Sequence, residues 1–123
     1  MIFLNNKKKE AYQYGLESED LARKALSKLG MKPIATRFHT PFGELDLIMQ
    51  DGEYIVFVEV KARRTMKNHD IVPKSKILKL CKAVDFYMMT EKLHRNTAIR
   101  FDYIAIEGSK IINHIKNAWD YII

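Results

Sequence analysis

Two segments of alternating polar and apolar residues, separated by Asp51-Gly52, constrain the fold of this chain most strongly. The first segment covers residues 43–48 and the second covers residues 54–63. Such alternation is typical of strands with one buried face, and Asp-Gly between two strands predicts a two-residue hairpin turn. Counting outward from this turn gives the expected cross-strand pairs: Gln50 with Glu53, Ile48 with Ile55, Asp46 with Phe57, and Glu44 with Glu59.

One face of this hairpin is expected to be charged at its open end, because side chains two residues apart share a face of a strand. Two carboxylates about 4–5 Å apart repel by roughly 3–4 kcal/mol at an effective dielectric near 20. A lysine offsets part of this repulsion, and Mg²⁺ or Mn²⁺ would offset the rest, since both ions prefer oxygen ligands. The alternative is that the acids are solvated strand ends and the lysine makes a surface ion pair. The charged residues are Glu44, Asp46, Glu59 and Lys61.

The rest of the chain predicts two helices and three further strands, which together favour an α/β fold with a mixed sheet flanked by helices. The helices are expected over residues 9–29, ending before Gly30, and from about residue 73 to 91. The strands are expected over residues 34–39, 98–106 and 111–116. The first helix carries an apolar stripe of Leu21, Ala22, Ala25, Leu26 and Leu29. Trp119, Tyr121 and Ile122 are expected to cover an end of the core.

Several charged side chains outside the hairpin are candidates for contact with its acids or with each other. Glu19 lies close to the buried stripe of its helix, so it either joins the carboxylates or sits exposed at the flank. Lys76 heads the stripe of Leu80, Ala83 and Tyr87; it either points towards the acids or is a solvated first-turn lysine. Arg100 and Asp102 share a strand face and are expected to form an ion pair.

Length and composition predict one soluble domain over residues 1–123. Cys81 is the only cysteine, which excludes an internal disulfide, and its helical position favours a buried structural thiol. No apolar run approaches the roughly 18 residues of a membrane span, so we expect a cytoplasmic protein without a membrane partner. The four histidines lack the spacing of a zinc site, and no glycine-rich loop predicts a nucleotide cofactor.

The formal charge of +6 suits a partner with a phosphate backbone. Basic residues concentrate in Lys7-Lys8-Lys9, around Arg63 and Arg64, and near Lys76 and Lys79. The polar loop over residues 65–70 is expected to be mobile and to lie near the substrate.

Asp46, followed thirteen positions later by Glu59-Val60-Lys61, resembles the motif of the PD-(D/E)XK nuclease superfamily. More narrowly, the sequence is similar to the YraN-like family of small bacterial proteins, considered relatives of archaeal Holliday-junction resolvases. Five blocks carry the resemblance in the order of the family: residues 15–22, 43–48, 56–63, the helix from Lys76 to Tyr87, and residues 100–102. The resemblance implies a restriction-endonuclease-like αβββαβ core.

It also implies a metal-dependent endonuclease that hydrolyses DNA phosphodiester bonds, with branched or structured DNA as one option. Asp46 and Glu59 would bind Mg²⁺ or Mn²⁺, with the Val60 carbonyl oxygen and Glu19 completing the site. Lys61 would orient the attacking water and stabilise charge on the phosphate. Glu44 and Lys76 would support these residues. The residues expected to contact DNA are Arg63, Arg64, Lys76 and Lys79.

Two alternatives stay open beside this hypothesis. The chain could be a non-catalytic nucleic-acid-binding protein that keeps the nuclease fold. It could also need a homodimer to complete its groove, as resolvase-like relatives do.

Overall fold

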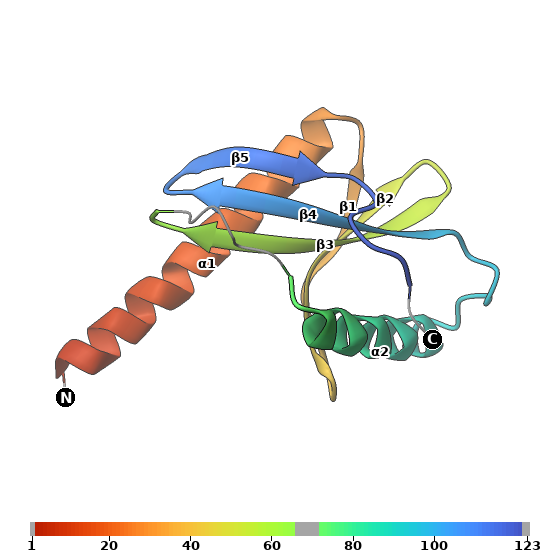
Figure 1. Ribbon diagram of the computed structural model, residues 1–123, viewed down its shortest axis with the longest axis horizontal. Coiled ribbons are helices and arrows are strands. Elements are labelled where there is room, and N and C mark those ends of the chain that lie inside the picture. The colour runs from red at the N-terminus through yellow and green to blue at the C-terminus, as the bar shows by residue number, and fades with distance from the viewer. Residues whose placement is uncertain (1, 66–71, 122–123) are drawn as a thin grey trace.

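The structure, a computed structural model, describes residues 2–65 and 72–121 (Figure 1). The predicted element order is confirmed, although the first helix begins at Ile2 and not at Lys9. The expected loop over residues 65–70 lies outside the described residues except for Thr65, and Ile122 lies outside them too. The elements are α1 (Ile2–Lys28), β1 (Lys32–Thr40), β2 (Gly43–Asp51), β3 (Tyr54–Arg63), α2 (Lys74–Thr90), β4 (Ile99–Glu107) and β5 (Lys110–Ile115).

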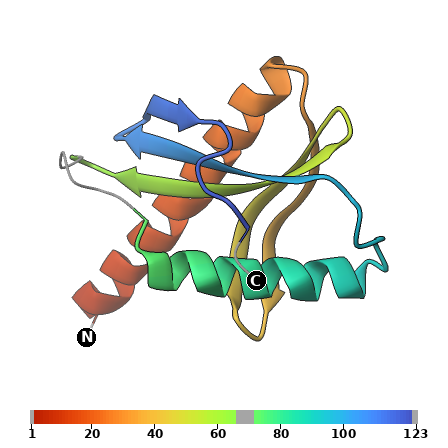
Figure 2. The ribbon, with the colours of Figure 1, turned by 45° about the vertical axis from the view of Figure 1, so that its right-hand side comes forward.

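The five strands form one mixed sheet in the order β1-β2-β3-β4-β5. The pair β3 and β4 is parallel, and the other three pairs are antiparallel. A parallel pair needs a long crossover connection, and α2 is the helix within it. Figures 1 and 2 show α1 and α2 on opposite faces of the sheet. The expected α/β class, with a mixed sheet flanked by helices, is therefore confirmed.

Each helix covers its own hydrophobic cluster. On the α2 side, Phe57 and Phe101 pack with helix residues that include Leu80, and the predicted stripe of α2 is buried there. On the α1 side, strand residues such as Val56 pack against Ala22 and Leu26. The prediction that Leu29 belongs to the buried stripe is wrong, because its side chain is 66% exposed. The α1 helix has already ended there, and the backbone turns at Gly30 (φ +96°) in a Schellman-type arrangement.

The sequence predictions for Cys81, for Trp119 and for the pair of Arg100 with Asp102 also agree with the structure. Cys81 is buried, as expected. Trp119 stacks on Phe101, with ring centroids 5.6 Å apart. Arg100 donates two hydrogen bonds to the fully buried Asp102, at 2.8 and 3.0 Å, which confirms the expected ion pair. No helix in the described part of the chain combines the length and the hydropathy that crossing a membrane requires.

The β2–β3 hairpin has a different register from the predicted one. Asp51 pairs with Tyr54, so Gly52 and Glu53 form the loop, and Ile48 faces Phe57. Glycine at the first loop position with a positive φ, here +59°, is typical of a type II′ turn, whereas the prediction placed it second, as in a type I′ turn. The predicted pairs are therefore wrong by two residues. An even shift does not by itself move any side chain to the other face.

The new register matters because it changes which acids are neighbours. Backbone pairing of β2 with β3 ends at Leu47 and Val58. One step further, Asp46 comes opposite Glu59, where the prediction had placed Glu44. The Asp46 carboxylate accepts a hydrogen bond from the Val60 N–H at 2.9 Å. This side-chain hydrogen bond takes the place of the next backbone hydrogen bond between β2 and β3.

Both β1 and β2 bend at this same point. Arg37, on β1 beside Asp46, has φ +48°, in the left-handed region that residues other than glycine seldom adopt. On β2, Leu45 packs in the α2-side cluster, although strict alternation would put it with Leu47 on the α1 side. Beyond the bend the two strands curve past α2 (Figure 2). The bend thus interrupts the pattern of the sheet where the acidic residues lie.

Candidate metal centre

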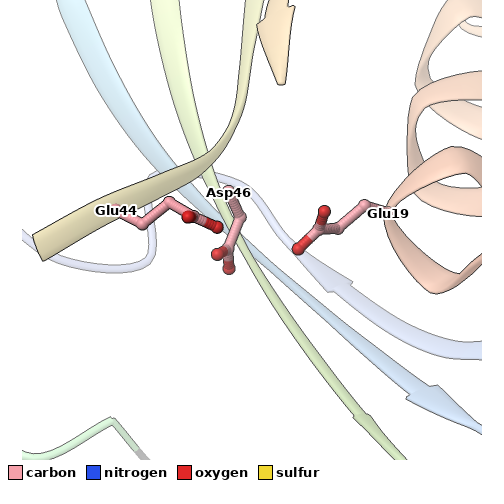
Figure 3. A group of neighbouring side chains, drawn as sticks. All are labelled: Glu19, Glu44 and Asp46. Atoms are coloured by element: carbon pink, nitrogen blue, oxygen red, sulfur yellow. The ribbon is translucent and has the colours of Figure 1, made fainter. Parts of the chain in front are cut away.

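Three carboxylates gather at the bend. Glu19 from α1 and Glu44 and Asp46 from β2 each offer one oxygen, and these oxygens all lie within 4.8 Å of one another. Figure 3 shows the three side chains pointing towards a common region. Each residue is partly buried, so bulk water screens their mutual repulsion only in part. We call these three residues the carboxylate group.

Glu59 adjoins this group from β3. Its side chain is 8% exposed, and its carboxylate forms an ion pair with Lys76 in which Nζ and Oε1 are 2.6 Å apart. Helical spacing left open whether Lys76 points towards the acids or into solvent, and the structure places its ammonium against Glu59. Burial opposes the charge on Lys76, but the contact with Glu59 outweighs it and raises the pKa of the lysine. Lys76 therefore stays protonated, and its positive charge compensates the negative charge of Glu59. The three acids of the carboxylate group have no such contact with Lys76.

Asp46 is the least compensated of these acids. Burial, followed by the charge of Glu59, raises its pKa from 3.8 to about 8, although the Val60 N–H works in the opposite direction. Glu19 contributes a smaller repulsion, and Asp46 also shares a hydrogen bond with Glu59. Two carboxyl groups can share such a bond only if one carries a proton. Without a cation, the site thus holds a proton that a nearby positive charge would displace.

Glu19 is held in place by Arg37. The Arg37 Nε donates to a Glu19 oxygen at 2.6 Å, and the guanidinium lies 4.8 Å from the centre of the Tyr12 ring. A Cβ at Gly15 would come within 2.9 Å of the same guanidinium, so the absence of a side chain there lets Arg37 lie against α1. Burial raises the pKa of Glu19, partly offset by Arg37, and Glu44 and Glu59 raise it further.

A pocket of about 430 Å³ opens beside the acids. Its lining includes Glu44, Asp46 and Glu59 on the sheet side, and Lys76 and Lys79 on α2. One wall is therefore acidic and the other basic. A phosphate group that entered this pocket would meet lysines on one side and carboxylates on the other, and the carboxylates would admit it only with a cation between them.

The remaining predicted site residues lie along the end of β3. Strand alternation puts Lys61 two positions beyond Glu59 on the same side of the sheet, where it is half-buried. Arg63 is exposed at the last position of the strand. Arg64 lies with its guanidinium 5.3 Å from the centre of the Tyr14 ring of α1. These residues extend the positive charge from the pocket towards α1.

Sequence reasoning did not identify Arg37, and it placed Glu44 in a supporting role. In the structure the Glu44 carboxylate is a member of the carboxylate group and also contacts the His39 ring nitrogen at 3.1 Å. Both features depend on the bend, which strand alternation does not reveal. The only sign of this arrangement in the sequence was an arginine, Arg37, in the strand before Gly43. The alternation of that strand did not show to which face of the sheet the Arg37 side chain points.

The element order, the mixed sheet and the acids at the opening between β2 and β3 define an α/β protein with a restriction-endonuclease-like core. Residues 18–106 match the uncharacterised protein family UPF0102, and the chain belongs to this family.

Relatives from several bacteria match most of the chain. A UPF0102 protein of Legionella pneumophila is 37% identical over 110 residues, which cover 86% of this chain and 93% of the relative. One from Neisseria meningitidis is 36% identical over 117 residues, covering 93% and 96%. One from Shewanella denitrificans is 41% identical over 101 residues, covering 79% and 91%.

Proposed function

We propose that this protein is a metal-dependent endonuclease that hydrolyses phosphodiester bonds of DNA, branched or otherwise structured DNA included. The observation that carries the proposal is the carboxylate group with Glu59 beside it, in a pocket whose other wall is basic. Folded proteins seldom keep several acids this close unless a cation or a proton compensates them.

The donor set fits the metal that the proposal requires. Every side chain of the group offers carboxylate oxygen, which suits Mg²⁺ or Mn²⁺ better than softer metals. Asp46, Glu59 and Glu19 would hold the ion, with the Val60 carbonyl oxygen and Glu44 as further oxygen donors. When bound, such an ion lowers the pKa of a water molecule and neutralises charge on a phosphate oxygen.

The protein's own residues would orient this site and its substrate. Lys76 holds Glu59 through its 2.6 Å ion pair, and Arg37 holds Glu19 in the same way. Lys61, on the same side of β3 as Glu59, would place an ammonium group near the phosphate and the attacking water. This arrangement would stabilise the negative charge that grows on the phosphate during hydrolysis.

Binding of DNA would use the basic residues around the pocket. Lys79 lines the pocket, and Arg63 and Arg64 lie at the end of β3. Together with Lys76 they would contact backbone phosphates, so binding should weaken as salt concentration rises.

The direct test is cleavage of labelled linear, flapped and four-way-junction DNA with Mg²⁺ or Mn²⁺. We expect wild-type protein to cut at least one of these substrates and Asp46→Asn to be slower by about 100-fold or more. Glu53→Gln is the matched control, because it also neutralises one acid but lies exposed in the hairpin loop. Its rate should equal that of the wild type.

Binding of every substrate with no cutting by either metal would contradict the nuclease and support the non-catalytic alternative. Thermal melting adds an independent measurement of the metal site. Millimolar Mn²⁺ should raise the melting temperature of the wild type and of Glu53→Gln, and should raise that of Asp46→Asn less.

A further inference from the structure

The N-terminal part of α1 extends beyond the sheet. Figures 1 and 2 show the helix leaving the sheet towards the N-terminus, and residues 6–13 are all exposed. We call residues 6–13 the arm. Most helices are stabilised by packing an apolar face against the rest of the protein. An exposed arm lacks that stabilisation, so its surface is available to a partner.

Helical spacing decides which charge of the arm faces the site. Lys8 precedes Glu19 by eleven residues, which is about three full turns, so the two side chains lie on the same stripe of α1. Tyr12 lies between them on this stripe, under the Arg37 guanidinium. In contrast, Lys28 follows Glu19 by nine residues, about two and a half turns, and lies on the opposite side of the helix.

We propose that the arm is a second contact for duplex DNA, in which Lys8 binds a backbone phosphate about five base pairs from the phosphate held at the carboxylate group. The inference rests on the proposed function, since the carboxylate group is taken as the cleavage site. Eleven residues of helix rise about 16 Å. Successive phosphates of one strand are about 3.4 Å apart along the duplex axis, so the rise spans about five steps when α1 lies along that axis, which the proposal includes.

The composition of the arm favours nucleic acid over a membrane surface. Its residues are Asn6, Lys7, Lys8, Lys9, Glu10, Ala11, Tyr12 and Gln13. A helix that lies on a membrane needs a broad apolar face opposite its charges. Within residues 6–13 the apolar residues are Ala11 and Tyr12, and the apolar Ile2, Phe3 and Leu4 precede the arm in the sequence. A phosphate backbone requires positive charge alone, which the lysines supply.

The test compares Lys8→Gln with Lys28→Gln, both introduced into Asp46→Asn so that the DNA remains intact. Anisotropy of a labelled 20-base-pair duplex is measured over a range of NaCl concentrations. We expect Lys8→Gln to weaken binding about threefold to fivefold and to reduce the salt slope by about one. Lys28→Gln and Lys8→Arg should bind like the parent protein.

A hairpin with a stem of four base pairs tests the spacing. This stem is too short to reach both contacts, so Lys8→Gln should weaken its binding much less than that of the duplex. Equal binding of the duplex by Lys8→Gln and its parent would overturn the proposal. So would an unchanged affinity for DNA together with reduced binding to phosphatidylserine vesicles, which would make the arm a membrane contact.

Failure of the arm contact and failure of the nuclease give different results. If wild-type protein cuts DNA and Lys8→Gln binds normally, the arm proposal fails and the nuclease stands. If the wild-type protein cuts none of the DNA substrates but Lys8→Gln still weakens binding to the duplex, the arm contact stands and the cleavage proposal fails.

Discussion

Replacing Asp46 with asparagine should stabilise the fold while it slows the proposed cleavage. Burial and neighbouring carboxylates raise the pKa of Asp46 from 3.8 to about 8. Because the pKa is higher in the folded state, folding must either take up a proton or keep an unfavourable charge. This cost is small below about pH 4, grows as the pH rises, and is complete above about pH 8.

The magnitude follows from the difference between these two pKa values. About four pH units correspond to about 6 kcal/mol at 1.36 kcal/mol for each unit. Asparagine removes the charge yet can still accept the Val60 N–H through its oxygen and donate to Glu59 through its amide. In folded proteins, relaxation of neighbouring groups and penetration of water reduce the cost of a buried charge below such an upper value. We therefore expect a gain of about 2 kcal/mol at pH 8.5, or roughly 8 °C in melting temperature.

Urea unfolding in EDTA at pH 4.5, 7 and 8.5 measures this gain. Trp119 is the only tryptophan and stacks on Phe101, so its fluorescence should report loss of the core. The gain should fall below about 0.5 kcal/mol at pH 4.5, where a proton already neutralises Asp46. Glu53→Gln should show no such dependence. Equal or lower stability of Asp46→Asn at pH 8.5, or a gain independent of pH, would refute the electrostatic account.

Two other predictions concern ion pairs. Arg37→Gln frees Glu19 and should lower the cleavage rate and the affinity for Mn²⁺ by about tenfold. Arg23→Gln should not, because the Arg23 guanidinium pairs with Asp20 and not with an acid of the site. Kinetics and melting with Mn²⁺ measure this, and equal effects of the two variants would contradict it. Asp102→Asn should cost about 3 kcal/mol in urea unfolding at pH 7. It removes the buried carboxylate that accepts two hydrogen bonds from Arg100 and leaves only Asp51, among the described residues, to pair with that guanidinium. Burial opposes the charge of Asp102, but its partners lower its pKa. The stability of the wild type should therefore decrease as the pH is lowered below about 4. Asp102→Asn should not show the part of this decrease that comes from protonation of Asp102.

Local patterns predicted the elements of this fold well. The bounds predicted for β3 agree with the structure, and those for α2 agree within one or two residues, because alternation and helical spacing directly reflect which residues are buried. Gly30 ended α1 nearly where expected. The start of α1 was missed because the arm buries no apolar stripe, so no periodicity marked it.

The hairpin register was less predictable. Asp51-Gly52 indicated a turn, but the same glycine serves a type I′ turn at the second loop position and a type II′ turn at the first. The choice depends on packing of the strands against both helices. Ile48 and Phe57 are both buried in the α2-side cluster, opposite each other in the observed register.

The sequence by itself determined the order of the helices and strands and the strand faces of Asp46 and Glu59. These properties follow from spacing along one element, or across one turn, and every even register shift preserves them. Only the tertiary structure decided the bend at Arg37, the place of Glu44 in the carboxylate group and the ion pair of Arg37 on β1 with Glu19 on α1. Those features arise where segments distant in the chain meet, because the position of each carboxylate there depends on how two helices and a bent sheet pack together.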